Sequence, residues 1–459
     1  MSWSPRAAPA VLIVAFLLSL PAVTTRIYAS DEVEAFAWLH SWFFDRDVDF
    51  QNEYRYFYDA GLVKTVSFHE TFLERTNEAG RRFNFAPIGC ALLWTPFYAA
   101  GHVAALVSGA PADGLGHPYV AAVAYGSAVY GLAALLLSLA IAAQLVGRGV
   151  AASVAIWLGT PLLFYMYVAP PMLHACSAFA VSLFVWVWLN VRDGWSVRGV
   201  VALGAAAALM AMVREQDVFF ALGPAIDFVG WAARGRPAAD LRRAVGLGAT
   251  GAGAFLLAYS PQLLAYRALN GHPWPTDYVT RKMTWTAPHS LQVLFSPEHG
   301  LFMWTPLALV AIAGLVWLAL GRVRTTAPDI RWIGAIMVLM VALQVYVNGS
   351  IESWTVAGSF GQRRFVALTP LLVVGLAAAI VAWSAAGRAA RIVAGALVAA
   401  CIWWNLGLMV QFGLNAMDRQ RLTPGANAWT TFVVLPAEAP RIAWRYLTAR
   451  ESFYNLPHQ

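Results

Sequence analysis

The stretch VLIVAFLLSLPAVTTRIYASDEVE, residues 11–34, joins an apolar run directly to a group of carboxylates. The run is long and apolar enough to start a membrane-spanning helix, which we place near 9–28. Asp31 and Glu32 follow it, and Asp45 and Asp47 lie a little further on. Neutral residues would connect two spans at lower electrostatic cost than charged ones. We therefore expect this acidic stretch to serve chemistry or ion binding.

The composition is that of an integral membrane protein. Of 459 residues, 59% are hydrophobic and only 12% are charged, whereas soluble domains carry about 25% charged residues. The net charge of +7 does not indicate nucleic acid, because the basic residues form short clusters between apolar segments. The three cysteines are isolated and predict neither a disulfide framework nor a metal site.

The apolar segments predict an all-α integral membrane fold of roughly eleven transmembrane helices. We place the spans near 9–28, 119–146, 150–168, 174–191, 199–213, 217–233, 244–266, 301–320, 332–348, 366–386 and 392–412. The first segment could instead be a signal peptide. It is long for one, however, and Ile27-Tyr28-Ala29 is a poor cleavage site, so we interpret it as a retained span.

The orientation follows from the basic clusters. Segment 87–107 contains Pro96 and could either cross the bilayer or lie along its surface. If it does not cross, the arginine-rich turns all fall on the inner side. All but four of the 24 acidic residues, and all nine histidines, then fall on the outer side. We expect a transmembrane domain over 1–412, with outer loops at 29–118 and 267–300 and an outer tail at 413–459.

The carboxylates are the first candidates for chemistry. Asp31 and Glu32 could share a proton, hold a cation or provide a base with a hydrogen-bonding helper; alternatively, they end the first helix and face water. Asp45 and Asp47 could supply a further acidic group, or belong to a solvated loop. No HExxH-type spacing is present, so we assign no metal ligand and expect no obligatory cofactor, although a divalent cation would suit the acidic outer side.

The basic candidates are three arginines. Arg214 lies between two apolar runs and either pairs with Glu215 or Asp217, or binds a lipid phosphate. Arg363 and Arg364 fall on the outer side, against the general charge bias, which favours them as phosphate ligands. Three further residues at the outer entrances of spans are candidates for lining a substrate pocket: His174, Glu298 and His299. A lone histidine there can equally be a satisfied interface residue.

This layout resembles the GT-C superfamily of polytopic glycosyltransferases, which includes protein O-mannosyltransferases and aminoarabinose transferases. The resemblance rests on a first span, a large outer loop, an acidic pair (here Asp31-Glu32) and a proline-containing interfacial segment (here Phe85-Ala86-Pro87 to Trp94-Thr95-Pro96). The chain departs from the named relatives in two places. His174 stands where they often carry an acid, and Ala86-Pro87-Ile88-Gly89 replaces a Lys-Pro-Pro-Leu type motif.

The resemblance implies an inverting glycosyltransferase in the bacterial inner membrane, with its active site on the periplasmic side. Its donor would be a polyprenyl-phosphate-linked sugar, and its acceptor a glycolipid, a polysaccharide or a protein. Asp31 would act as the base with Glu32, Asp45 or Asp47 assisting, while Arg214, Arg363 and Arg364 hold the phosphate. A transporter or flippase for lipid-linked saccharides is the main alternative, and a non-catalytic assembly scaffold is another. We find no internal repeat of the kind common in transporters.

Overall fold

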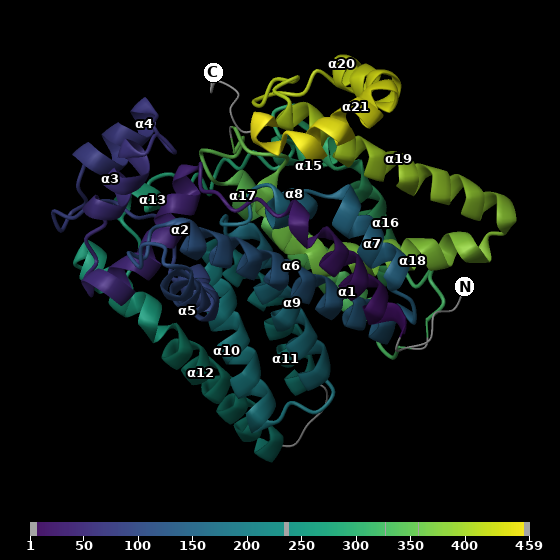
Figure 1. The fold of residues 1–459 in the computed structure, drawn as a ribbon. Coiled ribbons are helices and arrows are strands. Elements are labelled where there is room, and N and C mark those ends of the chain that lie inside the picture. The colour runs from purple at the N-terminus through teal and green to yellow at the C-terminus, as the bar shows by residue number, and fades with distance from the viewer. Residues whose placement is uncertain (1–6, 234–237, 326, 357, 454–459) are drawn as a thin grey trace.

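The structure is a computed structural model that describes residues 7–233, 238–325, 327–356 and 358–453. Helices build it throughout (Figure 1). Within the described residues, extended backbone pairs only as two isolated bridges, Thr76 with Arg82 and Met283 with Ile351. The expected all-α fold is confirmed.

In chain order, the helices divide into two groups, those before residue 117 and those from it onward. The first group contains α1 (Ala7–Ser19), α2 (Ser30–His40), α3 (Gln51–Asp59), α4 (Val66–Phe68) and α5 (Gly89–Ser108). The second group contains α6 (His117–Val146), α7 (Val150–Gly159), α8 (Leu162–Tyr167), α9 (His174–Val191), α10 (Val197–Val213), α11 (Leu222–Ala233), α12 (Ala238–Asn270), α13 (Asp277–Thr280), α14 (Gln292–Phe295), α15 (Leu301–Trp304), α16 (Pro306–Ala319), α17 (Ile330–Gly349), α18 (Thr369–Ala385), α19 (Arg388–Gly413), α20 (Pro424–Trp429) and α21 (Leu435–Thr448). Short 3-10 or π segments connect several of them: η1 (Leu20–Ala22), η2 (Ser41–Asp45), η3 (His69–Glu74), η4 (Glu215–Ala221), η5 (Arg363–Leu368), η6 (Thr430–Val434) and η7 (Arg450–Phe453).

Six helical segments in the described residues are long and apolar enough to cross a membrane. They are α5, α6, α9, α17, the joined η5–α18 segment and α19. Each of the eleven expected spans coincides with helix, but several are short or broken. The 150–168 segment divides at Thr160-Pro161, and the 301–320 segment divides before Pro306, because proline cannot donate to the preceding turn. The count of eleven stays a prediction.

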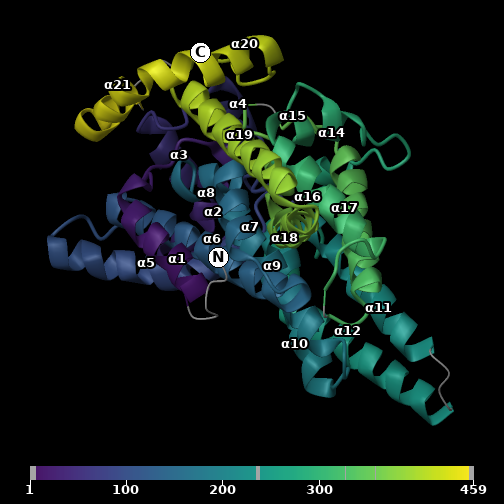
Figure 2. The same ribbon diagram turned by 90° about the vertical axis from the view of Figure 1, so that its right-hand side faces the viewer.

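Helix α5 runs across its neighbours. Figure 1 views it along its axis, whereas α10 and α12 extend in the plane of that picture, and Figure 2 shows α5 lengthwise. Its contact with α6 is close, since a methyl added to Gly126 would overlap the ring of Phe97. The segment has the length and apolarity of a span. That it lies along the bilayer surface without crossing stays a prediction.

The centre of the bundle is α18, which is almost entirely buried and appears end-on among its neighbours in Figure 2. It meets α16 where two glycines face each other. A methyl on Gly314 would overlap the carbonyl of Gly375, and one on Gly375 would overlap the carbonyl of Ala311. Only residues without side chains allow two backbones to come this close, as is common between membrane helices.

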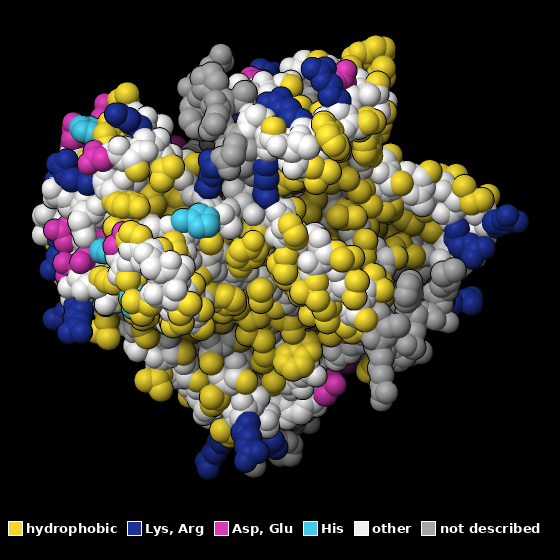
Figure 3. All heavy atoms as spheres, viewed as in Figure 1, with side chains coloured by type: hydrophobic (Ala, Val, Ile, Leu, Met, Phe, Trp, Pro, Cys, Tyr) yellow, Lys and Arg dark blue, Asp and Glu magenta, His cyan; other side chains and the backbone are white. Residues whose placement is uncertain are grey.

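Charge and apolar surface separate on the molecule. In Figure 3 a broad hydrophobic surface occupies the middle of the visible face, acidic side chains gather mainly at the left, and basic side chains lie at the bottom, the right and the top and also among the acidic ones. The acidic corner corresponds to α3 and α4 in Figure 1. A wide apolar surface flanked by polar ends is what a membrane-embedded protein presents to lipid.

Candidate functional site

The acidic stretch forms the first turn of α2. Glu32 closes the start of this helix, since its Oε2 accepts hydrogen bonds from the backbone N–H groups of Tyr28 at 2.8 Å and Ala29 at 3.1 Å. The side chain is completely buried, and burial raises the pKa of Glu32 to about 8. Glu32 therefore carries a proton at neutral pH and is poorly suited to act as a base.

Glu34 is a second buried carboxyl that sequence reasoning did not select. It accepts a 2.7 Å hydrogen bond from the backbone N–H of Phe85, and burial, reinforced by the charge of Asp31, raises its pKa well above the ordinary value. The signal was present, because residues three apart on a helix share a face and Glu34 stands three positions after Asp31.

Asp31 is the carboxylate that remains accessible. Its Oδ2 lies 2.6 Å from Nη1 of Arg363, and its side chain is 40% exposed. Arg363 begins η5, directly after a left-handed turn at Gly361, and its Nη1 also contacts the sulfur of Met172 at 3.7 Å. Two of the expected site residues, far apart in the sequence, thus form a direct ion pair.

The other two arginines lie beside this pair. Arg214 Nη1 donates to the carbonyl of Arg364 at 3.1 Å and lies 3.9 Å from Asp217 Oδ1. Arg364 donates from Nη2 to Ser353 Oγ at 3.0 Å, but its Nη1 is buried without a hydrogen-bond partner. Among the described residues no carboxylate lies within ion-pair distance of Arg364. The cluster therefore holds one guanidinium that its own carboxylates leave unpaired.

His174 and His299, the two candidate histidines, have different surroundings. His174 begins α9 within electrostatic range of all three arginines, packs its ring against Tyr165 at 4.5 Å, and leaves its buried Nδ1 without a partner. His299 is fully buried, stacks on Trp304 at 4.6 Å, and its Nε2 lies 2.8 Å from the carbonyl of Ser359. Burial lowers the pKa of His299 to about 4, so it is neutral. Glu298, next to it, is half-buried.

Asp45 and Asp47 belong to a different place, at the other end of α2. Asp45 pairs with His40 at 3.1 Å, and Asp47 accepts a 3.0 Å hydrogen bond from Ser41 Oγ. These contacts lie at the end of α2, whereas Asp31 lies at its start, so they do not bring Asp45 or Asp47 to Asp31. That Asp45 or Asp47 assists Asp31 stays a prediction. Together with Glu53, His40 and Asp45 form a set of side chains that could hold a metal ion.

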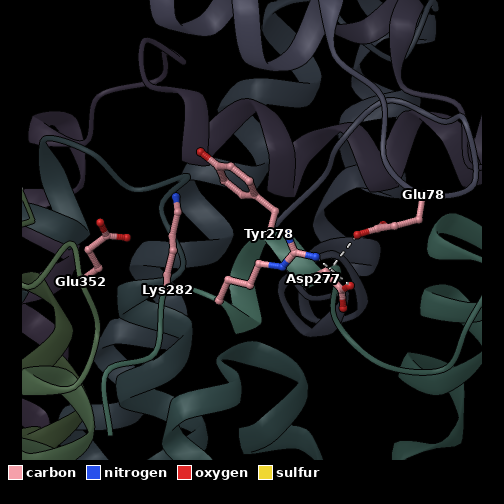
Figure 4. A pocket seen from close by; sticks show the side chains of 6 residues that line it. Glu78, Asp277, Tyr278, Lys282 and Glu352 are labelled. Carbon is pink, nitrogen blue, oxygen red and sulfur yellow. Dashed lines mark hydrogen bonds and ion pairs between the residues drawn. The ribbon is translucent and has the colours of Figure 1, made fainter. Parts of the chain in front are cut away.

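A cavity of about 480 Å³ lies between three parts of the chain that are far apart in the sequence. Its lining comes from the segment after η3, from α13 and the residues that follow it, and from the segment after α17, as Figure 4 shows: Glu78, Asp277, Tyr278, Arg281, Lys282 and Glu352. Tyr278 stacks on Phe85 at 5.4 Å, and the Lys282 ammonium lies 4.0 Å above the Tyr278 ring. Lys282 is also close enough for its charge to act on Glu34. The lining combines charged groups with one aromatic face.

The arrangement pairs an anion-binding group with a neighbouring carboxylate. Guanidinium N–H groups hold phosphate oxygens well, and a partly exposed carboxylate beside them can orient a hydroxyl or take its proton. Neither a protein-family model nor a curated protein sequence matches this chain. The chemistry must therefore be argued from the site itself.

Proposed function

We propose that this protein is an integral-membrane inverting glycosyltransferase of GT-C type in the bacterial inner membrane. It takes a sugar from a polyprenyl-phosphate donor and transfers it to an acceptor at the periplasmic face. The observation that carries the proposal is the buried, unpartnered Nη1 of Arg364, beside an Asp31–Arg363 ion pair. A buried guanidinium N–H without a partner is costly, and a phosphate oxygen would satisfy it.

The position of the arginines suits a lipid-linked phosphate. Arg363 and Arg364 begin the η5–α18 segment and His174 begins α9, both of which are candidate membrane spans. A headgroup phosphate lies at the level where spans end, whereas its lipid chain extends alongside them. Arg363, Arg364 and Arg214 would bind the donor phosphate, and His174 would lie against the donor headgroup.

Asp31 is assigned the base. Its carboxylate accepts the proton of the acceptor hydroxyl while that oxygen bonds to the anomeric carbon from the face opposite the phosphate. The bond between the anomeric carbon and the phosphate oxygen breaks, and polyprenyl phosphate leaves on the arginines. The configuration at carbon inverts. Phosphate is a good leaving group, so positioning and charge stabilisation contribute most of the rate.

The cavity lined by Tyr278 and Lys282 is a suitable place for the acceptor. The charge of Lys282 acts on Glu34, which is on the same helix as Asp31, and the Tyr278 face and charged rim could receive a polar, hydroxyl-bearing group. A glycolipid, a polysaccharide and a protein side chain all present such a group. Glu32 keeps its proton and holds the first turn of α2 in place, and no cofactor is needed for the steps above.

The test is transfer by purified protein in lipid vesicles, given a panel of labelled polyprenyl-phosphate sugars and crude envelope acceptors. We expect Asp31→Asn to lower transfer about 100-fold or more, and Asp59→Asn, an exposed carboxylate on the same loop, to leave it unchanged. Equal transfer by both variants would remove Asp31 from the mechanism. Movement of donor lipid between leaflets without transfer, equal in all three proteins, would favour the transporter.

A further inference from the structure

A second polar cluster lies where α2 ends. His40 is the last residue of α2, Asp45 is the last residue of the π-helical segment η2, and Glu53 lies in the first turn of α3. His40 Nδ1 is 2.8 Å from Glu53 Oε1 and 3.1 Å from Asp45 Oδ2. One ligand atom from each residue lies within 4.8 Å of the others. Single-turn π segments inside helices are frequent at functional sites.

The other ring nitrogen decides how this cluster can be satisfied. His40 Nε2 lies 3.1 Å from the carbonyl oxygen of Asp113, which can only accept a hydrogen bond, so Nε2 must carry a proton. A neutral ring then presents the lone pair of Nδ1 to two carboxylates. That contact is repulsive unless the ring takes a second proton, one of the carboxyl groups is protonated and donates to Nδ1, or a cation lies between the three groups. Histidines that bind metals ordinarily donate their other N–H to just such a carbonyl.

The remaining carboxylate oxygen favours a cation, and the dimensions of the cluster are compatible with one. An ion bonded to two ligand atoms at about 2.1 Å, at angles of 90–110°, holds them roughly 3.0–3.4 Å apart, close to the two separations around His40. Glu53 is completely buried, and its Oε2 has no hydrogen-bond partner. A bound ion would satisfy this carboxylate, which protein groups alone leave half-satisfied. Phe44 stacks on the His40 ring at 5.2 Å and covers one side of the cluster.

We propose that His40, Asp45 and Glu53 bind a divalent first-row metal ion, with Zn²⁺ the best match to one imidazole and two carboxylates. The site lies apart from the reacting groups of the proposed transfer, since nine residue steps along α2, about 14 Å, separate His40 from Asp31. Its role is to fasten three segments of the first outer loop together: the end of α2, the start of α3 and the turn at Asp113. The ion thereby fixes the helix that presents Asp31.

The experiment measures zinc on the full-length protein in detergent. The protein is treated with a chelator, titrated with ZnCl₂, desalted, and analysed for bound metal and for thermal unfolding. We expect one equivalent of zinc and a higher unfolding temperature. Asp45→Asn, at a partly exposed position that is compatible with folding, should weaken zinc binding at least about 100-fold. Glu53→Gln should do the same.

A matched control is available on the same loop. His69 and Glu74 form an exposed pair with a similar separation of 3.0 Å, with no third ligand beside them among the described residues, so His69→Ala should keep both the zinc and the thermal shift. If the protein binds no stoichiometric zinc, a proton on the imidazole or on a carboxyl group satisfies the cluster, and the proposal is wrong. If Asp45→Asn retains zinc as tightly as His69→Ala does, the ion lies elsewhere, and the proposal is also wrong.

Discussion

Replacing Glu32 with glutamine should stabilise the protein in alkaline solution. Burial raises the pKa of this carboxyl from 4.5 to about 8. The stability that its protonated form contributes to the folded state is therefore fully present below pH 4.5 and is lost as the pH rises through 8. The pKa difference of 3.5 (8 minus 4.5) corresponds to a loss in the free energy of unfolding of about 5 kcal/mol above pH 8 and of about 3 kcal/mol at pH 7. Glutamine cannot ionise, and its amide oxygen can still accept from Tyr28 and Ala29.

The assay is reversible denaturation in mixed micelles at pH 5, 7 and 9, comparing wild type with Glu32→Gln. We expect similar stability at pH 5 and a widening advantage for the variant at pH 7 and 9. Glu34 titrates in both proteins, so its contribution cancels in the comparison. Glu70→Gln, at an exposed position, should follow wild type at every pH. Parallel curves for wild type and Glu32→Gln would show that Glu32 ionises freely and would refute the reasoning.

Two further predictions concern packing and topology. Gly314→Val should destabilise the bundle by roughly 1–3 kcal/mol or more, because its side chain meets the α18 backbone; Gly253→Val, which faces open space, is the control, and equal melting temperatures would contradict the prediction. If α5 does not cross the bilayer, cysteines at Lys64 and Pro111 should both react with an impermeant reagent in intact cells. Labelling at only one of them would show that α5 crosses; the native cysteines are buried and give little background.

The helices could be predicted because apolar length is a local property. All eleven expected segments coincide with helix. The two clearest breaks fall at Pro161 and Pro306, and each could have been predicted, because proline lacks the backbone N–H that a continuous helix needs. The close crossing of α16 and α18 could not be predicted, since it depends on which glycines face each other after folding.

The candidate site was predictable in its parts but not in its assembly. Arg363 and Arg364 stood out because they violate the charge bias of the loops, and Asp31 stood out because it follows the first apolar run. Their direct contact is a tertiary fact with no sequence signal. Likewise, the π-helical turn at η2 brings Asp45 back to His40, a contact over five residues that regular α-helical spacing does not favour.

The charges of the Arg214, Arg363 and Arg364 cluster connect its stability to its proposed function. Asp31 pairs with Arg363 and Asp217 lies near Arg214, so the third guanidinium, Arg364, meets Ser353 but no anion in the part of the chain that the structure describes. A buried positive charge without an anion destabilises the folded state. Any phosphate that enters therefore gains more here than at a neutral surface, and binding should stabilise the protein as a whole. If the cluster served structure alone, we would expect a carboxylate beside Arg364. The phosphate of a lipid-linked donor would supply the missing negative charge.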